Sequence, residues 1–280
     1  MTLTWSEVQH RRLIELEVPP QELSQAFTSP ADRDNSFHKL ENHYIKQART
    51  QLTYFREHEH RPALCRLESQ LIETLTAAGF VQVITPTIMS RGLLAKMTID
   101  ETHPLFSQVY WLDKDKCLRP MLAPHLYYVL KDLLRLWEKP VSIFEVGSCF
   151  RKESQGSLHS SEFTMLNLVE MGLPLENRQA RLEELAALVT RTAGLTDYTL
   201  ETETSNVYGE TIDVVAGKDK IEVGSAAIGP HPLDRAWRIV EPWVGIGFGL
   251  ERLLMVTQNS HNLGKMGRSL AYLNGIRLNI

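Results

Sequence analysis

Cysteine is scarce in this 280-residue chain, which contains only three. Cys65, Cys117 and Cys149 are widely spaced, with no CxxC pair and no Cys/His cluster at metal-ligand spacing. We therefore expect no structural zinc site and reduced thiols. A chain of this length also buries enough apolar surface to fold without disulfides.

Long apolar runs are missing as well. No segment approaches the roughly 20 apolar residues that a membrane-spanning helix needs. The N-terminus lacks the basic stretch and apolar core of a secretory signal peptide. We therefore expect a cytoplasmic protein that makes no contact with a membrane.

Neither sign of charge is in excess, since 30 basic and 34 acidic residues give a net charge of −4. This balance disfavours a general nucleic-acid coat but permits a local basic surface. Residues 1–61 predict a polar, helical N-terminal segment, within which residues 38–56 are locally basic. Lys46, Arg49 and Arg56 are candidate contacts to RNA phosphates, and a solvated helix face is the alternative.

Residues 62–280 predict one domain of helices and strands. Pro62 can begin a helix with leucines at 64, 67, 71 and 75, and Gly79 can end it. Further helices are expected at about 124–138 and 176–193, and strands at about 80–84, 108–112, 117–121, 142–151, 162–171, 211–215, 220–228 and 243–249. There is no regular βαβα alternation and no GxGxxG after the first strand, so a doubly wound fold is disfavoured. The predicted fold is α+β, an antiparallel sheet flanked by helices.

Residues 150–165 predict a β-hairpin able to bind a nucleotide. Arg151 and Glu153 fall on one strand face because strand side chains alternate. The guanidinium of Arg151 can hold a phosphate or carboxylate through paired hydrogen bonds, and Phe163 can stack under a purine. Taken alone, an exposed Arg-x-Glu on a strand is more often an ordinary solvent-facing pair without a ligand.

Residues 245–254, GIGFGLERLL, carry glycine at every second position and then continue into a helix. A strand face without side chains lets a ligand or another backbone approach closely. Arg252, in the first helical turn after Gly249, would place a cation beside that face, which suits the triphosphate of ATP. Tight packing of the strand on a helix is the alternative.

These features occur in the order of motifs 1, 2 and 3 of the class II aminoacyl-tRNA synthetases, which the chain resembles from about residue 64 to 255. The resemblance implies that motif 1 forms a homodimer interface and that motifs 2 and 3 bind ATP. It implies that Arg151 holds the α-phosphate and the amino-acid carboxylate, and that Arg252 faces the far phosphates; these two are the catalytic residues. The other ATP-binding residues that it implies are Glu153, His159, Phe163, Glu222, Ser225 and Gly249. Glu222 and Ser225, three apart on one predicted strand, would hold Mg²⁺ with the phosphates.

Longer strings make the resemblance more specific. Residues 118–124 (LRPMLAP), 163–167 (FTMLN), 207–211 (VYGET) and 242–245 (PWVG) are similar to the pyrrolysyl-tRNA synthetases. The chain resembles the short type, without a separate N-terminal tRNA-binding domain, so residues 1–61 become a better candidate for tRNA contact. The implied reaction is ATP-dependent ligation of pyrrolysine to its amber-suppressor tRNA, tRNA(Pyl), through an aminoacyl-adenylate.

The residues expected to line the amino-acid pocket are mostly apolar. Leu126 and Leu130 share a helix face with Tyr127 beside them, and Asn167 is the main polar group. Tyr208 is expected to close over the substrate as a lid. The full expected set is Met121, Ala123, Leu126, Tyr127, Leu130, Asn167, Val169, Tyr208, Ala227, Trp243 and Gly245. With no acid among them the pocket suits lysine poorly; core packing, and a surface turn for Tyr208, are the alternatives.

The chain departs from the common family pattern in two places. Ser160 and Ser161 stand where relatives commonly have Leu-Glu, which removes an apolar contact near the adenine, and Gly224 replaces a usual serine. Two other functions fit the class II pattern: a synthetase for another large amino acid, and a regulatory protein without catalysis. Asn167 and Tyr208 argue against the first, and the retained phosphate-binding arginines against the second.

Overall fold

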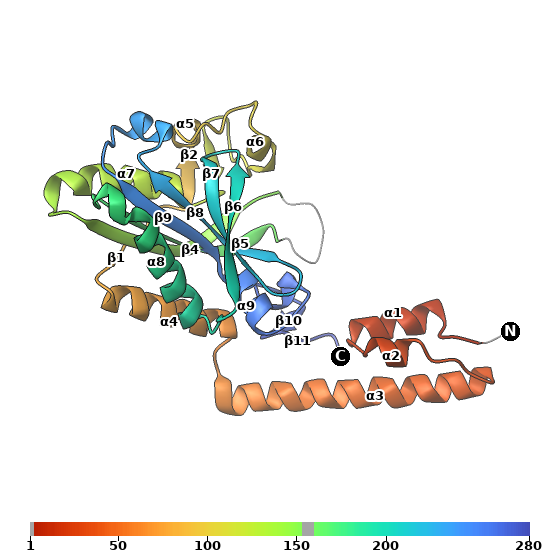
Figure 1. Cartoon of the computed structure of the whole chain (residues 1–280). Helices are drawn as coiled ribbons and strands as arrows, with labels where there is room; N and C mark the ends of the chain where they lie inside the picture. The colour runs from red at the N-terminus through yellow and green to blue at the C-terminus, as the bar shows by residue number, and fades with distance from the viewer. Residues whose placement is uncertain (1–2, 153–159) are drawn as a thin grey trace. The chain divides into compact units, whose positions relative to one another are not determined.

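The computed structural model describes residues 3–152 and 160–280, which form two compact units (Figure 1). One unit is Met1–Pro62 with Ser269–Ile280, and the other is Ala63–Arg268. The C-terminal twelve residues thus pack with the N-terminal segment, although the sequence analysis grouped them with the larger domain. Among the described residues, no helix is long and apolar enough to cross a membrane.

The smaller unit is the helical segment that the sequence predicted. Its elements are α1 (Glu7–Glu15), α2 (Pro20–Leu23), α3 (Pro30–Tyr54), the π-helical turn η1 (Phe55–Glu59) and the hairpin of β10 (Tyr272–Leu273) and β11 (Ile276–Arg277). Ser6 caps α1 in a capping box with Gln9, and Ser29 caps α3 ahead of Pro30. Trp5, Leu13, Leu16, Val18 and Phe27 form its buried core.

The larger unit is built on a seven-stranded sheet with strand order β1-β4-β5-β9-β8-β7-β6. Its strands are β1 (Val81–Gln82), β4 (Val141–Phe150), β5 (Glu162–Met171), β6 (Tyr198–Ser205), β7 (Gly209–Ala216), β8 (Ile221–Gly229) and β9 (Trp243–Gly249). All neighbouring pairs are antiparallel except β1 and β4. The predicted α+β class with an antiparallel sheet is confirmed.

Two hydrophobic cores lie on the two faces of this sheet. The helices α4 (Ala63–Ala77), α8 (Arg178–Thr192) and α9 (Leu250–Thr257) pack on one face, where Phe144, Leu166 and Phe248 are fully buried (Figure 1). The helix α7 (Ala123–Leu136) covers part of the other face, against Ile143 and Val169. Side chains alternate between faces along each strand, so one strand supplies both cores.

Smaller elements surround α7 and the sheet ends. They are β2 (Ile88–Ser90), α5 (Arg91–Ala95), α6 (Pro104–Gln108), β3 (Lys116–Leu118), and the 3-10 turns η2 (Leu175–Asn177), η3 (Pro232–Trp237) and η4 (Leu263–Lys265). β2 and β3 form a separate antiparallel ribbon.

The expected strand bounds hold best in the middle of the sheet. β5 and β9 begin and end at the predicted residues, because both are flanked on each side by other strands. The expected strand at 108–112 is wrong: Gln108 ends α6, and the residues after it form no strand, although Trp111 makes an isolated bridge to Cys117 and backbone hydrogen bonds join Tyr110 and Leu112 to β3. β6 was missed because this edge strand is largely exposed and polar, so it lacks an apolar alternation.

Candidate active site

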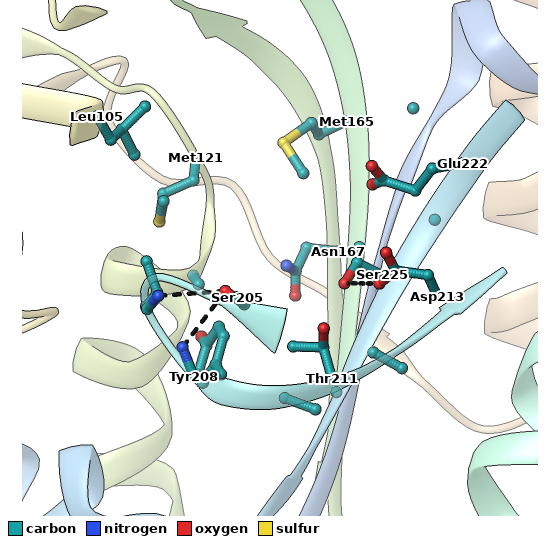
Figure 2. Close-up of a pocket in the computed structure, with 18 of the residues that line it drawn as sticks. Leu105, Met121, Met165, Asn167, Ser205, Tyr208, Thr211, Asp213, Glu222 and Ser225 are labelled. Atoms are coloured by element: carbon teal, nitrogen blue, oxygen red, sulfur yellow. Dashed lines mark hydrogen bonds between the residues drawn. The ribbon is translucent and has the colours of Figure 1, made fainter. Parts of the chain in front are cut away.

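A cavity of about 540 Å³ opens on the face of the sheet that carries α7, between that helix, β5, β8, β9 and the β6–β7 turn (Figure 2). The predicted site residues that line it are Met121, Ala123, Leu126, Tyr127, Leu130, Arg151, Phe163, Asn167, Val169, Tyr208, Glu222, Ser225, Ala227, Trp243, Gly245, Gly249 and Arg252. Glu153 and His159 lie outside the described residues. The three basic residues proposed for RNA contact, Lys46, Arg49 and Arg56, belong to the other unit.

One end of the cavity is apolar. Leu126, Tyr127 and Leu130 project from α7 and are buried, and Val169 faces them from β5. Their spacing along the helix places all three on one face. Asn167, two residues before Val169 on β5, points into the cavity and brings one side-chain amide into this apolar surface (Figure 2).

The β6–β7 turn holds Tyr208 over the apolar end. The Ser205 hydroxyl oxygen accepts hydrogen bonds from the backbone N–H groups of Val207 (3.1 Å) and Tyr208 (3.4 Å), which fixes the turn (Figure 2). The Tyr208 ring lies edge-on to Trp243, with 6.2 Å between ring centroids. Burial raises the pKa of the Tyr208 phenol above its usual range, so the hydroxyl stays protonated and can donate to a ligand.

An acidic residue that the sequence analysis missed lies behind this end of the cavity. Asp234 is buried, and its carboxylate accepts hydrogen bonds from the Tyr127 hydroxyl (3.1 Å) and from Trp243 Nε1 (2.8 Å). Burial is the main reason that the pKa of Tyr127 is strongly raised, with smaller contributions from nearby Tyr208 and Asp234. No local pattern could have identified Asp234, which is 107 residues from Tyr127 in the chain.

The opposite end of the cavity carries the two predicted catalytic arginines. Arg151 follows the last residue of β4; its Nε donates to the Pro120 carbonyl (2.9 Å) and its guanidinium lies 5.2 Å from the centroid of the Phe163 ring. Arg252 lies in the first turn of α9, where Nη1 donates to the Glu222 carbonyl (3.0 Å). Two cations at one end of a cavity provide a binding surface for phosphates.

Glu251 joins α9 to the strand β5. It is buried, and both carboxylate oxygens accept from the Thr164 backbone N–H at 2.9 Å. Burial raises the pKa of this carboxyl, while the Thr164 N–H and the charge of Arg268 act in the opposite direction. The helix that carries Arg252 is therefore anchored to the strand that carries Phe163 and Asn167.

A β-bulge brings two predicted metal-binding residues to the same side of β8. The register runs from Val215 opposite Glu222 to Val214 opposite Gly224, so Val223 has no partner. Residues three apart on a regular strand face opposite sides. The bulge turns Val223 into the buried core and leaves Glu222 and Ser225 on the cavity side (Figure 2).

Asp213 on β7 completes this corner and was also missed. Its carboxylate accepts a 2.6 Å hydrogen bond from the Ser225 hydroxyl (Figure 2). Thr211 and Asp213 are two apart on a predicted strand and both line the cavity, so strand alternation could have identified the aspartate. Two carboxylates and a hydroxyl fit Mg²⁺, which proteins commonly bind through one or two carboxylates together with substrate phosphates. Within the described residues, no group of three or more His, Cys, Asp and Glu could hold a metal alone.

A buried ion pair supports the strand end that leads to Arg151. Arg119 Nη1 lies 2.6 Å from Glu145 Oε1, and Arg119 Nε donates to the Ser148 carbonyl (2.8 Å). The Thr85 hydroxyl donates to Glu145 Oε2 (2.7 Å). Gly147 must be glycine, because a Cβ there would collide with the Arg119 guanidinium.

The family model of the tRNA synthetases class II core domain (F) matches residues 50–274. The chain therefore belongs to the class II aminoacyl-tRNA synthetases, as the order of its motifs predicted.

Within this family, the chain is similar over its whole length to solved pyrrolysyl-tRNA synthetases. The crystal structure of the pyrrolysyl-tRNA synthetase from Desulfitobacterium hafniense shares 52% identity with a TM-score of 0.90, covering 100% of both chains. A structure of Desulfitobacterium hafniense PylSc, a pyrrolysyl-tRNA synthetase, shares 51% identity with a TM-score of 0.87, covering 99% of this chain and 96% of that one. The predicted resemblance is confirmed.

Among curated proteins, the threonine–tRNA ligase of Burkholderia mallei (strain SAVP1) is 28% identical over 152 residues, or 48% of this chain and 24% of that protein. That of Burkholderia multivorans (strain ATCC 17616 / 249) is 26% identical over the same length. The match thus spans about a quarter of these relatives.

Proposed function

We propose that this chain activates pyrrolysine with ATP and transfers it to its cognate tRNA, tRNA(Pyl). The observation that carries the proposal is one cavity with Asn167 set in an apolar end and Arg151 and Arg252 at the other. An aliphatic side chain that ends in an amide and a ring fits the apolar end, where Asn167 can both donate and accept. The full-length similarity to pyrrolysyl-tRNA synthetases supports the same substrate.

The proposed reaction has two steps. The carboxylate of the amino acid attacks the α-phosphorus of ATP, forming the aminoacyl-adenylate as pyrophosphate leaves. A hydroxyl of the terminal ribose of the tRNA then attacks the acyl carbon, and AMP leaves. Arg151 binds the α-phosphate and the carboxylate, and Arg252 binds the departing phosphates, so catalysis comes from positioning and charge stabilisation. The described residues that we assign to ATP are Arg151, Phe163, Glu222, Ser225, Gly249 and Arg252.

Glu222 and Ser225 are the residues that would hold Mg²⁺, with Asp213 fixing the Ser225 hydroxyl. When bound, the ion would neutralise charge on the phosphates of ATP. Glu222 also lies near Arg252, with 3.4 Å between Glu222 Oε2 and Arg252 Nη1. A carboxylate and a guanidinium therefore lie side by side where the metal and the triphosphate are expected to bind.

Free lysine is expected to be a poor substrate. An ammonium at the apolar end would meet no lining carboxylate, and the buried Asp234 behind the wall already accepts from three donors. Leaving an ammonium desolvated and unpaired costs several kcal/mol. An Nε-acylated lysine has no such charge.

We further propose that the enzyme is a cytoplasmic homodimer in which motif 1 pairs with a second copy. In the segment after α4, Val81, Ile84 and Ile88 are 43%, 90% and 51% exposed. Apolar side chains exposed together are typical of an interface. Light scattering on the purified protein should give twice the 31.9 kDa chain mass, and a monomer at micromolar concentration would contradict the dimer.

The test of the proposed function is ATP–pyrophosphate exchange with pyrrolysine or an Nε-acylated lysine, beside lysine and phenylalanine. Exchange with the acylated lysine alone supports both the chemistry and the pocket assignment. Exchange with another amino acid would retain the enzyme class and overturn the substrate. No exchange with any of them would favour a non-catalytic protein.

A further inference from the structure

Asp234 connects two walls of the amino-acid pocket without lining the cavity itself. Its Oδ1 accepts from the Tyr127 hydroxyl on α7, and its Oδ2 accepts from Trp243 Nε1 on β9. The residue is 2% exposed. One carboxylate therefore holds together a helix and a strand that supply adjoining parts of the pocket wall.

The local role of Asp234 uses only part of its hydrogen-bonding capacity. It is the third residue of η3, and its Oδ2 accepts from the His231 backbone N–H (2.7 Å) in a capping box. An ionised carboxylate can accept about four hydrogen bonds, so the capping box leaves room for the two aromatic donors. Gly229 also makes room for Trp243, because a Cβ there would collide with the indole Nε1.

These bonds fix both the position and the polarity of the pocket wall. The Tyr127 ring stacks on Trp237, with 5.4 Å between centroids and 17° between planes, and meets Trp243 edge-on at 5.8 Å and 89°. The hydroxyl hydrogen of Tyr127 and the indole hydrogen of Trp243 both point to Asp234. Neither hydrogen is then available to a ligand, and the wall presents mainly ring surface.

We propose that Asp234 is a specificity-determining positioning residue, which sets the depth of the amino-acid pocket and keeps its end wall apolar by engaging the polar hydrogens of Tyr127 and Trp243. The substrate class that such a wall selects is an uncharged acyl group of limited size on the lysine Nε. This inference rests on the proposed function and assigns its side-chain selectivity to a residue outside the cavity.

The test compares substrates of increasing acyl size in the full-length enzyme. Pyrophosphate exchange is measured for Nε-acetyl-, Nε-tert-butyloxycarbonyl- and Nε-benzyloxycarbonyl-lysine with wild type, Asp234→Asn and Asp234→Ala. We expect Asp234→Ala to raise kcat/KM for the largest substrate relative to the best small one by about 10-fold or more, because both rings lose their anchor. Asp234→Asn should shift the same ratio less. The KM for ATP should stay within about twofold in both variants, because the carboxylate of Asp234 bonds to none of the residues assigned to ATP.

Glu170→Gln is the matched control. Glu170 is also a buried carboxylate that accepts three hydrogen bonds, from Ser142 and twice from Arg181 of α8, but its side chain does not line the cavity. Its variant should lower the melting temperature without changing the substrate ratio. If Asp234→Asn and Asp234→Ala lower the melting temperature but leave the ratio unchanged, Asp234 only caps η3 and the inference is overturned.

The two proposals fail in different ways. If the wild type exchanges none of the acylated lysines, the proposed substrate is overturned. The role of Asp234 is then tested with the ratio of kcat/KM between the amino acid that the enzyme does activate and a homologue with a larger side-chain end. An unchanged ratio in an active variant overturns the role of Asp234 alone. If Asp234→Ala does not fold, the ratio for Asp234→Asn decides.

Discussion

The two arginines that we propose to be catalytic are held by backbone carbonyls. Arg151 Nε donates to Pro120 and Arg252 Nη1 donates to Glu222. Pro120 is adjacent to Arg119, whose buried guanidinium is paired with Glu145. These contacts fix the direction of each side chain before a ligand binds. Less conformational entropy is then lost when the reacting groups are brought together.

We expect Arg151→Ala to leave the fold intact and to reduce adenylate formation by at least about 10²–10³-fold, because one phosphate-binding donor is lost. Circular dichroism checks the fold and pyrophosphate exchange measures the activity. Arg191→Ala, an exposed arginine at the end of α8, is the control and should behave as wild type. Near-normal exchange in Arg151→Ala would overturn the assignment.

His125 makes the folding stability of the chain depend on pH. It is buried beside Thr85, with 3.3 Å between Nδ1 and the hydroxyl, and its pKa is lowered by burial and by Arg119, against a smaller opposing effect of Glu145. The folded chain therefore takes up this proton at lower pH than the unfolded chain. The stabilisation is complete above the usual pKa of 6.5 and is lost as the pH falls through the lowered value.

We expect the wild type to lose more thermal stability between pH 7.5 and 5.5 than His125→Asn, which has no proton to take up in this range. Melting temperatures at the two pH values measure the difference. His10→Asn, at an exposed position, serves as the control and should retain the wild-type pH dependence. An equal loss in wild type and His125→Asn would show that other groups carry the effect.

At the scale of elements, β8 shows how one extra residue changes a site. Without the bulge at Val223, strand alternation would place Glu222 and Ser225 on opposite faces. In this chain the neighbouring Gly224 leaves room for Phe248 and the Gly247 carbonyl, which a Cβ at that position would press into. Both features shape the corner where the metal and phosphates are proposed to bind.

We predict that Glu222→Gln weakens ATP binding in the presence of Mg²⁺ by about 10-fold or more, because the proposed metal site loses the carboxylate that the bulge leaves on the cavity side. Val223→Ala keeps the bulge and should bind ATP nearly as wild type, although loss of buried methyl groups costs about 2 kcal/mol of stability. Calorimetric titration of ATP into both variants, after their folding is checked, distinguishes the two effects. Wild-type affinity in Glu222→Gln would show that the carboxylate positioned by the bulge is unimportant for the site.

For the whole molecule, the division into two units separates the proposed tasks. All described residues of the cavity belong to Ala63–Arg268, whereas the exposed Lys46, Arg49 and Arg56 belong to the smaller unit. Amino-acid activation needs only the cavity. Transfer also needs tRNA, so a defect in the smaller unit should affect the second step alone.

We expect simultaneous replacement of Lys46, Arg49 and Arg56 by alanine to weaken tRNA(Pyl) binding by about 10-fold or more and to reduce its salt dependence, because phosphate contacts release counterions. Pyrophosphate exchange should be unchanged. Filter binding at several salt concentrations measures the first effect. Three exposed basic residues of the larger unit provide the matched control: Lys114, Arg135 and Lys218. Equal tRNA binding by both triple variants would place the contact elsewhere.

The sequence by itself determined the fold class, the order of the three motifs and about half of the cavity lining. Strand alternation defined β5 and β9, and helical spacing placed Leu126, Tyr127 and Leu130 on one face. These features depend on residues close together in the chain, where a period of 2 or 3.6 determines the direction of each side chain. The resemblance to known synthetases then supplied the chemical roles, which no periodicity contains.

The tertiary structure alone decided what lies behind the cavity and how its corners are arranged. Asp234 meets Tyr127 across 107 residues, and Arg119 meets Glu145 through contacts that no local period encodes. The bulge at Val223 depends on register against β7. Residues 269–280 join the N-terminal unit through packing that becomes visible only when the chain is folded. Buried polar groups must find partners wherever the fold places them, so their identity follows from the three-dimensional arrangement.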